Sequence, residues 1–379
     1  MNPADCRKHF PIFSSRSYLF WGALAPAATE VRAQWDSWAE AWSTDPNSVI
    51  TGDMKLGGMS LARQAFARLI GAEASEIALT DNTSRAANLA IRILEAKGNG
   101  YVIVDDTTYP SSVYPWRARG WDVRYVPTAD SPDPSGAIAD AIDDGCLAVC
   151  VSHVAPFSGL RHDLTALARA AHAHGAFLMV DAAQSAGVVP VDVRASEVDL
   201  LFTTGMKWLL GPPGIAFLYV SAELLADAPV LDVGYIGLDV ASGDWPVTSL
   251  PAISREARRY ELGLPSLPAL YAAAAGIEIL REAGVEPISQ QVEHLVTQCI
   301  NGLSEHGQES LTPRNPTLRA GVVVFRHKAA SSLFDHCRSE RVDIGTVGSD
   351  LVRVDFHGFN NEDDLRRFLE CFKSFTKAS

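Results

Sequence analysis

Short apolar runs recur along the first two thirds of the chain. Most of them are continuous rather than alternating, which is typical of strands whose two faces are both covered. Helical periodicity fills several of the intervals between them. The runs lie at residues 76–80, 101–106, 123–127, 147–154, 177–184, 200–204 and 215–220.

Two of the intervening stretches carry clear helix signals. Residues 84–98 place apolar side chains at helical spacing and end on Gly98. Residues 164–175 begin after Asp163 and end on Gly175, so that stretch has a capping residue at each end. Strands that alternate with helices predict an α/β fold built on a layered sheet.

After about Pro251 the pattern changes. We predict helices at 267–284, 287–306 and 329–340 and from 361 onwards, with strands at 321–326 and 351–355. This order predicts a smaller α+β domain at the C-terminus. The predicted organisation is an N-terminal segment (1–15) that packs on the small domain, a large domain (16–250) and the small domain (251–379).

Composition narrows the class of protein. The formal charge is −13 at pH 7, which argues against a nucleic-acid surface because that surface would need a basic patch. The six cysteines are scattered and show neither a disulfide framework nor metal-ligand spacing, as in a reduced cytosolic protein. We see no signal segment and no run that could cross a membrane. The sequence therefore predicts a cytoplasmic protein that binds no metal, membrane or nucleic acid.

Ligands of open α/β sheets bind at the carboxyl ends of the strands. After the first run, Asn82, Thr83 and Ser84 fall at a helix start, where free backbone N–H groups and hydroxyls would hold an anion such as phosphate. An ordinary helix N-cap explains them equally well.

Two more strand ends carry ionisable side chains. Asp181 ends an apolar run with Gln184 close behind; its carboxylate needs a cationic partner, or else it is a helix cap. Lys207 lies in a turn between two apolar runs, where a lowered pKa would make it a nucleophile; the alternative is a lysine that extends to solvent. Together, a phosphate cradle, an aspartate and a lysine match the needs of pyridoxal phosphate.

At these residues the chain resembles the class V aminotransferase family of pyridoxal-phosphate enzymes, fold type I, which includes cysteine desulfurases, selenocysteine lyases and isopenicillin N epimerase. The resemblance covers most of the chain and implies a mostly parallel seven-stranded sheet with helices on both faces. It rests on these segments: YLFWGALAPAA, TDNTSRAANLA, DTTYPSSVYPW, SHVAPFSGLRHDL, VDAAQSAG, TTGMKWLLGPPGIAFLYV, RRYELGLPSLPAL and LVRVDFHGFNNEDDLRRFL.

The resemblance implies a role for each cofactor-binding residue. Lys207 would form the Schiff base, Asp181 would pair with the pyridinium nitrogen, and Gln184 would hydrogen-bond the phenolic oxygen of the ring. The remaining contacts are implied for Asn82, Thr83, Ser84 and Thr204 at the phosphate, for Tyr109 stacked on the ring, and for Ser152 beside it. A core tyrosine is the alternative for Tyr109.

The implied substrate contacts are fewer. Arg353 would clamp the substrate carboxylate through its fork of donors, with a structural ion pair as the alternative. Ala23 belongs to the N-terminal substrate loop. His153, next to Ser152, would lie beside the ring.

The chain departs from its relatives at three places. Met206 replaces a histidine that commonly precedes the lysine, and Leu264 replaces a threonine that reaches the partner subunit's phosphate. The segment before the arginine strand, residues 341–350, contains no cysteine, and Cys337 lies in a predicted helix. This argues against a desulfurase that passes sulfur on as a persulfide.

The sequence constrains the type of reaction less than it constrains the fold and the cofactor. We favour a lyase that cleaves the C–S bond of a cysteine-like amino acid, with an aminotransferase second; an epimerase, a decarboxylase or a pyridoxal-phosphate-binding sensor are further alternatives. A homodimer is implied by resemblance. Tryptophans in residues 37–42 and 242–247 could serve its interface, the substrate entrance or the core.

Overall fold

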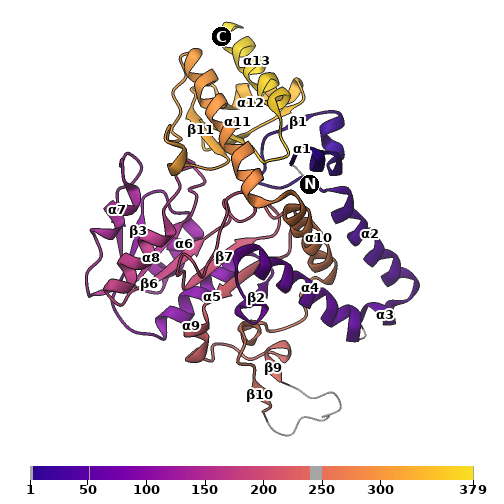
Figure 1. Ribbon diagram of the computed structural model, residues 1–379, viewed down its shortest axis with the longest axis vertical. Helices are drawn as coiled ribbons and strands as arrows, with labels where there is room; N and C mark the ends of the chain where they lie inside the picture. Colours follow the sequence, from indigo (N-terminus) through magenta and orange to yellow (C-terminus); the bar gives the residue numbers. More distant parts are fainter. Residues whose placement is uncertain (1–2, 51, 240–249, 379) are drawn as a thin grey trace.

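The computed structural model describes residues 3–50, 52–239 and 250–378 and is built on a seven-stranded sheet (Figure 1). All strands are parallel except β8, which runs antiparallel to both of its neighbours. This confirms the predicted α/β fold. The strand order is β2 (Ile77–Thr80), β8 (Ala216–Val220), β7 (Leu200–Thr204), β6 (Phe177–Asp181), β5 (Cys146–Ser152), β3 (Tyr101–Asp105) and β4 (Asp122–Val126).

Successive strand residues enter different hydrophobic clusters, because side chains alternate between the faces of a sheet. In β6, Leu178 and Val180 join one cluster, while Met179 joins the other. The second cluster contains the apolar face of α5 (Thr83–Glu95), and the first contains that of α8 (Leu164–Ala173). Burial on both faces explains why the apolar runs are continuous.

The segment that precedes the sheet is helical, which the sequence analysis did not predict. It forms α2 (Thr29–Thr44), α3 (Pro46–Ile50) and α4 (Gly52–Ile70). Both α2 and α4 pack against α10 (Leu267–Ala283). Figure 1 shows α2 and α3 projecting from one side of the body.

A second, three-stranded antiparallel sheet lies near the C-terminus, with the order β11 (Val322–Arg326), β14 (Leu351–Asp355) and β13 (Gly345–Val347). The accompanying helices are α11 (Val285–Glu305), α12 (Ala330–Ser339) and α13 (Glu362–Ala378) (Figure 1). Strand β1 (Ser17–Tyr18) pairs with β12 (Val342–Asp343), so the start of the chain joins this region. The proposed domain boundaries remain a prediction.

The other elements are short. They are the helices α1 (Pro3–Cys6), α6 (Pro110–Ala118), α7 (Pro134–Ala139) and α9 (Ala222–Ala226), the strands β9 (Leu238–Asp239) and β10 (Ala252–Ile253), and 3-10 turns at Arg7–His9, Pro11–Ser14, Ala74–Glu76, Tyr235–Gly237, Ala257–Tyr260 and Pro316–Leu318. The tryptophan-bearing segment 242–247 lies outside the described residues.

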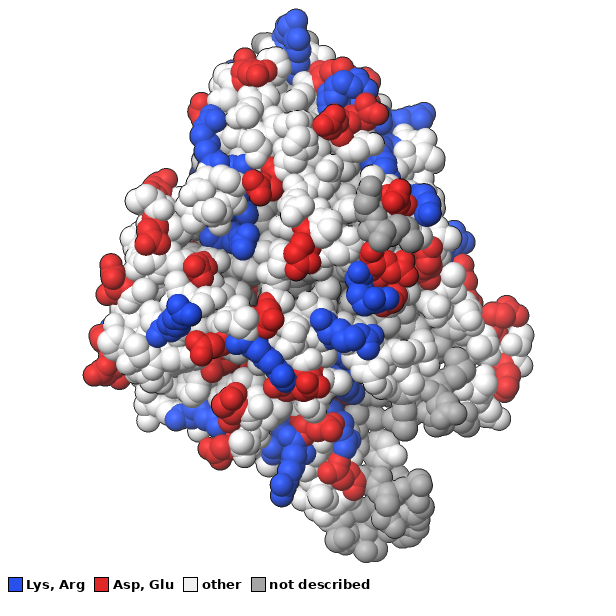
Figure 2. Space-filling model, viewed as in Figure 1, with Lys and Arg blue, Asp and Glu red and all other residues white. Residues whose placement is uncertain are grey.

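The surface mixes charges of both signs. Figure 2 shows basic and acidic side chains interspersed over the visible face. Within the described ranges, no helix is both long enough and apolar enough to cross a membrane.

Candidate active site

A cavity of about 320 Å³ opens at the carboxyl ends of the central strands. It gathers every residue that the sequence predicts to bind the cofactor. Strand register explains part of this convergence, because Ser152 and Asp181 are paired neighbours at the ends of β5 and β6. The predicted residues among those lining the cavity are Asn82, Thr83, Ser84, Tyr109, Ser152, Asp181, Gln184, Thr204 and Lys207.

Asp181 is the last residue of β6 and is buried. Its Oδ2 accepts a hydrogen bond from Ser112 Oγ (3.1 Å), and its Oδ1 accepts one from the backbone N–H of Ala183 (2.9 Å). Burial raises the pKa of Asp181, while those two bonds and the charge of Lys207 partly oppose the rise. The carboxylate therefore lies where a cationic partner would relieve its desolvation.

Lys207 lies in the turn that follows β7. Backbone bonds hold this turn, from Leu210 N–H to the Lys207 carbonyl (3.0 Å) and from Gly211 N–H to the Gly205 carbonyl (2.8 Å). Burial lowers the pKa of Lys207, and Asp181 partly restores it. The Nζ atom lies 6.0 Å from the centre of the Tyr109 ring and donates to no residue that the structure describes. A buried lysine with a free amine is suited to nucleophilic attack on a carbonyl.

The N-terminus of α5 forms another wall of the cavity. Asn82 caps the helix by accepting a hydrogen bond from Arg85 N–H (2.9 Å), so the N-cap explanation holds for this residue. The N–H groups of Thr83 and Ser84, in the same first turn, have no partner within the helix and favour an anion. Ser84 Oγ donates to Ser111 Oγ (3.1 Å) beside them. The cavity thus offers a phosphate site, a buried carboxylate and a free amine, which fits pyridoxal phosphate.

A buried network adjoins the cavity and contains residues that the sequence analysis missed. Gln184 Oε1 accepts hydrogen bonds from Trp208 Nε1 and Arg353 Nη2 (both 2.8 Å), and Gln184 Nε2 donates to the Gly22 carbonyl (3.1 Å). Asp355 accepts from Arg353 Nε (2.7 Å) and from Gly22 N–H (2.8 Å). One N–H of Gln184 therefore stays available for a ring oxygen.

In this network Arg353 forms an ion pair with Asp355, which is the structural role given above as the alternative to binding the substrate carboxylate. A Cβ on Gly22 would approach Arg353 Nη2 to 1.7 Å, so only glycine can cover the guanidinium this closely. Arg353 Nη1 has no partner among the described residues. The N-terminal loop that holds Ala23 is anchored by a bond from Ala25 N–H to the Met206 carbonyl (2.8 Å).

His153 lies elsewhere. It follows Ser152 directly, and neighbouring residues of an extended chain point to opposite sides. Ser152 lines the cofactor cavity, whereas His153 is buried against a separate cavity with Arg161 and His162. The expectation that His153 lies beside the ring does not agree with this geometry.

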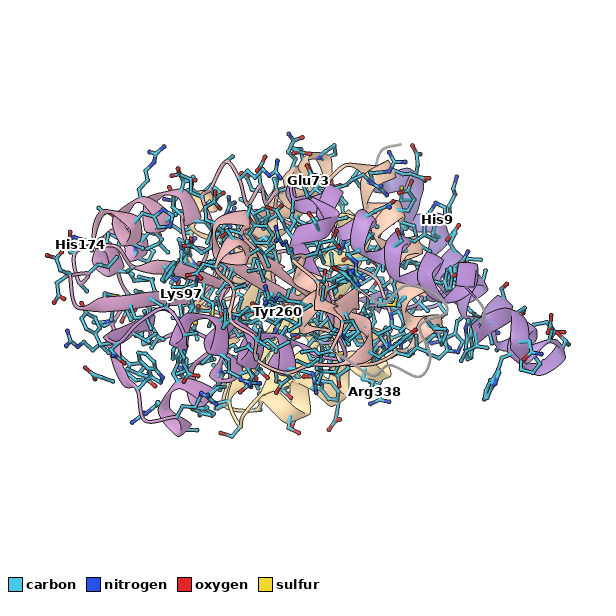
Figure 3. All side chains as sticks on the ribbon, turned by 90° about the horizontal axis from the view of Figure 1, so that it is seen from below. His9, Glu73, Lys97, His174, Tyr260 and Arg338 are labelled. Carbon is cyan, nitrogen blue, oxygen red and sulfur yellow. The ribbon has the colours of Figure 1, made fainter. Side chains whose placement is uncertain are left out.

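The structure also shows where the residues that depart from the family pattern lie. Met206 lines the cofactor cavity, and Leu264 is 42% exposed. All six cysteines are buried. His174 lies at the outer edge of the molecule, where it pairs with Asp144 (2.8 Å), as expected of a surface histidine (Figure 3).

Comparison with known proteins settles the family. The family model for class-V aminotransferases matches residues 17–349. The chain belongs to the class-V aminotransferase family. Members of this family are enzymes, and the cofactor of this class-V enzyme is pyridoxal phosphate.

Individual relatives cover most of the class-V chain. The uncharacterized aminotransferase YcbU of Bacillus subtilis (strain 168) is 30% identical over 310 residues, which span 82% of this chain and 81% of the relative. A probable cysteine desulfurase of Pyrococcus abyssi (strain GE5 / Orsay) is 30% identical over 343 residues, 84% and 83% of the two chains.

Solved structures share the fold. The apo cysteine desulfurase of Thermococcus onnurineus NA1 superimposes with a TM-score of 0.88 at 24% identity and covers 100% of this chain and 99% of that one. A C-DES variant with glycine covalently linked to its pyridoxal-phosphate cofactor superimposes with a TM-score of 0.87 at 20% identity, covering 96% and 98%.

Proposed function

We propose that the chain is a pyridoxal-phosphate-dependent lyase that cleaves the C–S bond of a cysteine-like α-amino acid. The observation that carries this proposal is the placement of Lys207 and Asp181 in one cavity that ends at the α5 N-terminus. The 30% identity to a probable cysteine desulfurase supports sulfur chemistry.

Different residues bind different parts of the cofactor. Thr83, Ser84 and Thr204 hold the phosphate, with Asn82 fixing the helix end. Asp181 pairs with the pyridine nitrogen, and Lys207 carries the covalent link. When bound, pyridoxal phosphate supplies an electron sink for the bonds at Cα.

Lys207 also moves the proton. Burial lowers the pKa of its amine, which favours the neutral form that can accept a proton from Cα at Nζ. Tyr109, whose ring centre lies 6.0 Å from the amine, would stack on the cofactor ring. The thiol leaves from Cβ, and the rest of the substrate hydrolyses. One S-substituted cysteine and one water thus give one pyruvate, one ammonia and one thiol.

The free thiol leaves without a protein persulfide. Only residues 348–350 join β13 to β14, so the arginine strand is preceded by a tight hairpin. Cys337 and Cys371, the cysteines nearest to it in sequence, are buried in α12 and α13. Thiols in these positions are poor acceptors of sulfur.

Transamination is the second candidate. The relative YcbU is named an uncharacterized aminotransferase at the same 30% identity. Arg353 Nη1 could take a substrate carboxylate in either reaction.

A second copy of the chain would cover an apolar groove on the projecting helices. Trp42 is 60% exposed and Ile50 57% exposed, and both line this groove with Trp38 and Leu264. We propose a homodimer through this groove, in a cytoplasmic enzyme that takes a small amino acid as its substrate.

Product analysis tests the proposed reaction. The holoenzyme is incubated with cysteine, cystine and S-alkylcysteines, with no keto acid present, and pyruvate, ammonia and thiol are measured. A lyase gives the three products in equal amounts over many turnovers. An aminotransferase gives one keto acid per active site, retains the thiol in it and stops. The Lys207→Ala variant is the control for both.

A further inference from the structure

A second cavity, of about 560 Å³, lies beside the end of β5. His153, Arg161 and His162 line it together with Ser135. Thr317 closes it from the C-terminal part of the chain. Clefts between separate parts of a fold are frequent ligand sites.

Two histidines in this cavity have unsatisfied nitrogens. His153 is 3% exposed and His162 is 1% exposed. The Nδ1 atoms of both are buried and have no hydrogen-bond partner among the described residues. Unpaired buried polar atoms are costly and uncommon in folded proteins, so both nitrogens call for an external partner.

Arg161 supplies the positive charge. It is only partly exposed, and its guanidinium donates to no residue in the described ranges. Two carboxylates also line the cavity as helix caps: Asp163 accepts from Ala166 N–H (3.0 Å), and Asp133 accepts from Gly136 N–H (2.9 Å). The charge of Asp163 acts on Arg161, but neither carboxylate forms an ion pair with it in the described ranges. A guanidinium in this setting is prepared for a planar or tetrahedral oxyanion.

We propose that this cavity binds a small oxyanion, a carboxylate or a phosphate, on Arg161 between His153 and His162. His162 is held from its far side, because its Nε2 faces the carboxylate of Asp105 (3.1 Å).

The cavity is connected to the cofactor site through the backbone. His153 N–H donates to the Asp181 carbonyl (2.9 Å), and the His153 carbonyl accepts from His162 N–H (3.0 Å). Arg161 N–H donates to the Leu318 carbonyl (2.8 Å), which ties the cavity to the C-terminal part. A bound oxyanion would therefore stabilise the end of β6, where Asp181 lies.

Calorimetric titration of the holoenzyme tests the site, because the bound cofactor already fills the phosphate site at α5. The probes are inorganic phosphate and lactate, measured separately to distinguish the two oxyanions. Wild type should bind at least one of them at one site, with a matching rise in Tm. Arg161→Gln should weaken binding about 30-fold or more. Arg169→Gln removes the same charge from the exposed side of α8 and should leave binding unchanged.

The proposal is overturned if wild type binds neither probe, or if Arg161→Gln binds as tightly as wild type. A second measurement needs no variant. Wild-type crystals soaked in selenate should show anomalous selenium density against Arg161, and selenate found only outside this cavity would also refute the site.

Discussion

Two pairs of opposite charge are buried within the same active-site region, and they differ in whether the two charged groups are in contact. Arg353 contacts Asp355 directly at 2.7 Å, and Gly22 and Gln184 satisfy further atoms of the pair. Lys207 and Asp181 line one cavity, and Lys207 makes no hydrogen bond within the described part of the chain. The arginine pair is in contact without a ligand, with only Nη1 of Arg353 left unpaired among the described residues, whereas the lysine pair leaves room for a ligand between its charges.

The difference separates structural from chemical roles. Contact with a partner offsets much of the desolvation cost of a buried charge, so the arginine pair mainly holds three chain segments together. The lysine pair has no such contact. Burial lowers the pKa of Lys207 and raises that of Asp181, but it raises the pKa of Asp355 as well, so direct contact and not the pKa shift distinguishes the two pairs. Lys207 and Asp181 are the groups that would gain from a bound cofactor.

The largest effect is expected for Lys207→Ala. The change removes both the covalent attachment point and the proton acceptor, so turnover should fall below detection. The apoenzyme should still fold, because the side chain that is lost is a buried amine whose charged form is disfavoured by burial. Activity assays and the absorbance of the bound cofactor measure this. An unchanged cofactor spectrum in the variant would show that Lys207 is not the attachment point.

Asp181→Asn should lower kcat about 100-fold or more, since it removes the charge opposite the electron sink. The Tm of the apoenzyme should stay level or rise, because burial disfavours the ionised carboxylate. Steady-state kinetics and thermal unfolding of the apoenzyme measure the two effects. A large fall in apoenzyme Tm would place Asp181 among the structural pairs.

Asp355→Asn should give the opposite result. Breaking a buried ion pair leaves an unpaired charge and costs about 3–5 kcal/mol of unfolding free energy. Urea unfolding of the apoenzyme measures it. Asp350→Asn is the matched control, because Asp350 pairs with Arg326 at an exposed site near the same sheet and should cost under about 1 kcal/mol. Equal effects of the two variants would refute the distinction.

The smallest effect concerns pH. Below its pKa the Lys207 amine is protonated and cannot attack the cofactor aldehyde. Attachment of pyridoxal phosphate to the apoenzyme should therefore accelerate with pH around a midpoint below 10.5, the ordinary lysine value. Asp181 raises that pKa, so Asp181→Asn should move the midpoint lower still.

Stopped-flow absorbance over a pH series measures this midpoint. Nα-acetyl-lysine treated with the same cofactor corrects for titration of the cofactor itself. A midpoint at or above the value for that amine would contradict a buried, depressed lysine.

The sheet and the cofactor cavity were predictable for a common reason. Strands buried on both faces must be continuously apolar, and the rule for strand ends then places Asp181 and Lys207 at one edge. Helix α2 escaped prediction because it is mostly exposed, with Val31 as its buried residue, and so has no wide apolar stripe.

The arginine network was beyond sequence reasoning, since Gly22, Gln184 and Asp355 come from three distant segments that meet only in the fold. The position of His153 was within reach. Side chains alternate along a strand, so Ser152 and His153 could not both face the cofactor. A strict count of period two would have separated them.

The most direct test of the central claim is to locate the cofactor's covalent attachment. The holoenzyme is reduced with borohydride, digested and mapped by mass spectrometry. The account predicts a phosphopyridoxyl group on the peptide that contains Lys207. The same group on another lysine, or on none, would contradict the assignment of this cavity as the active site.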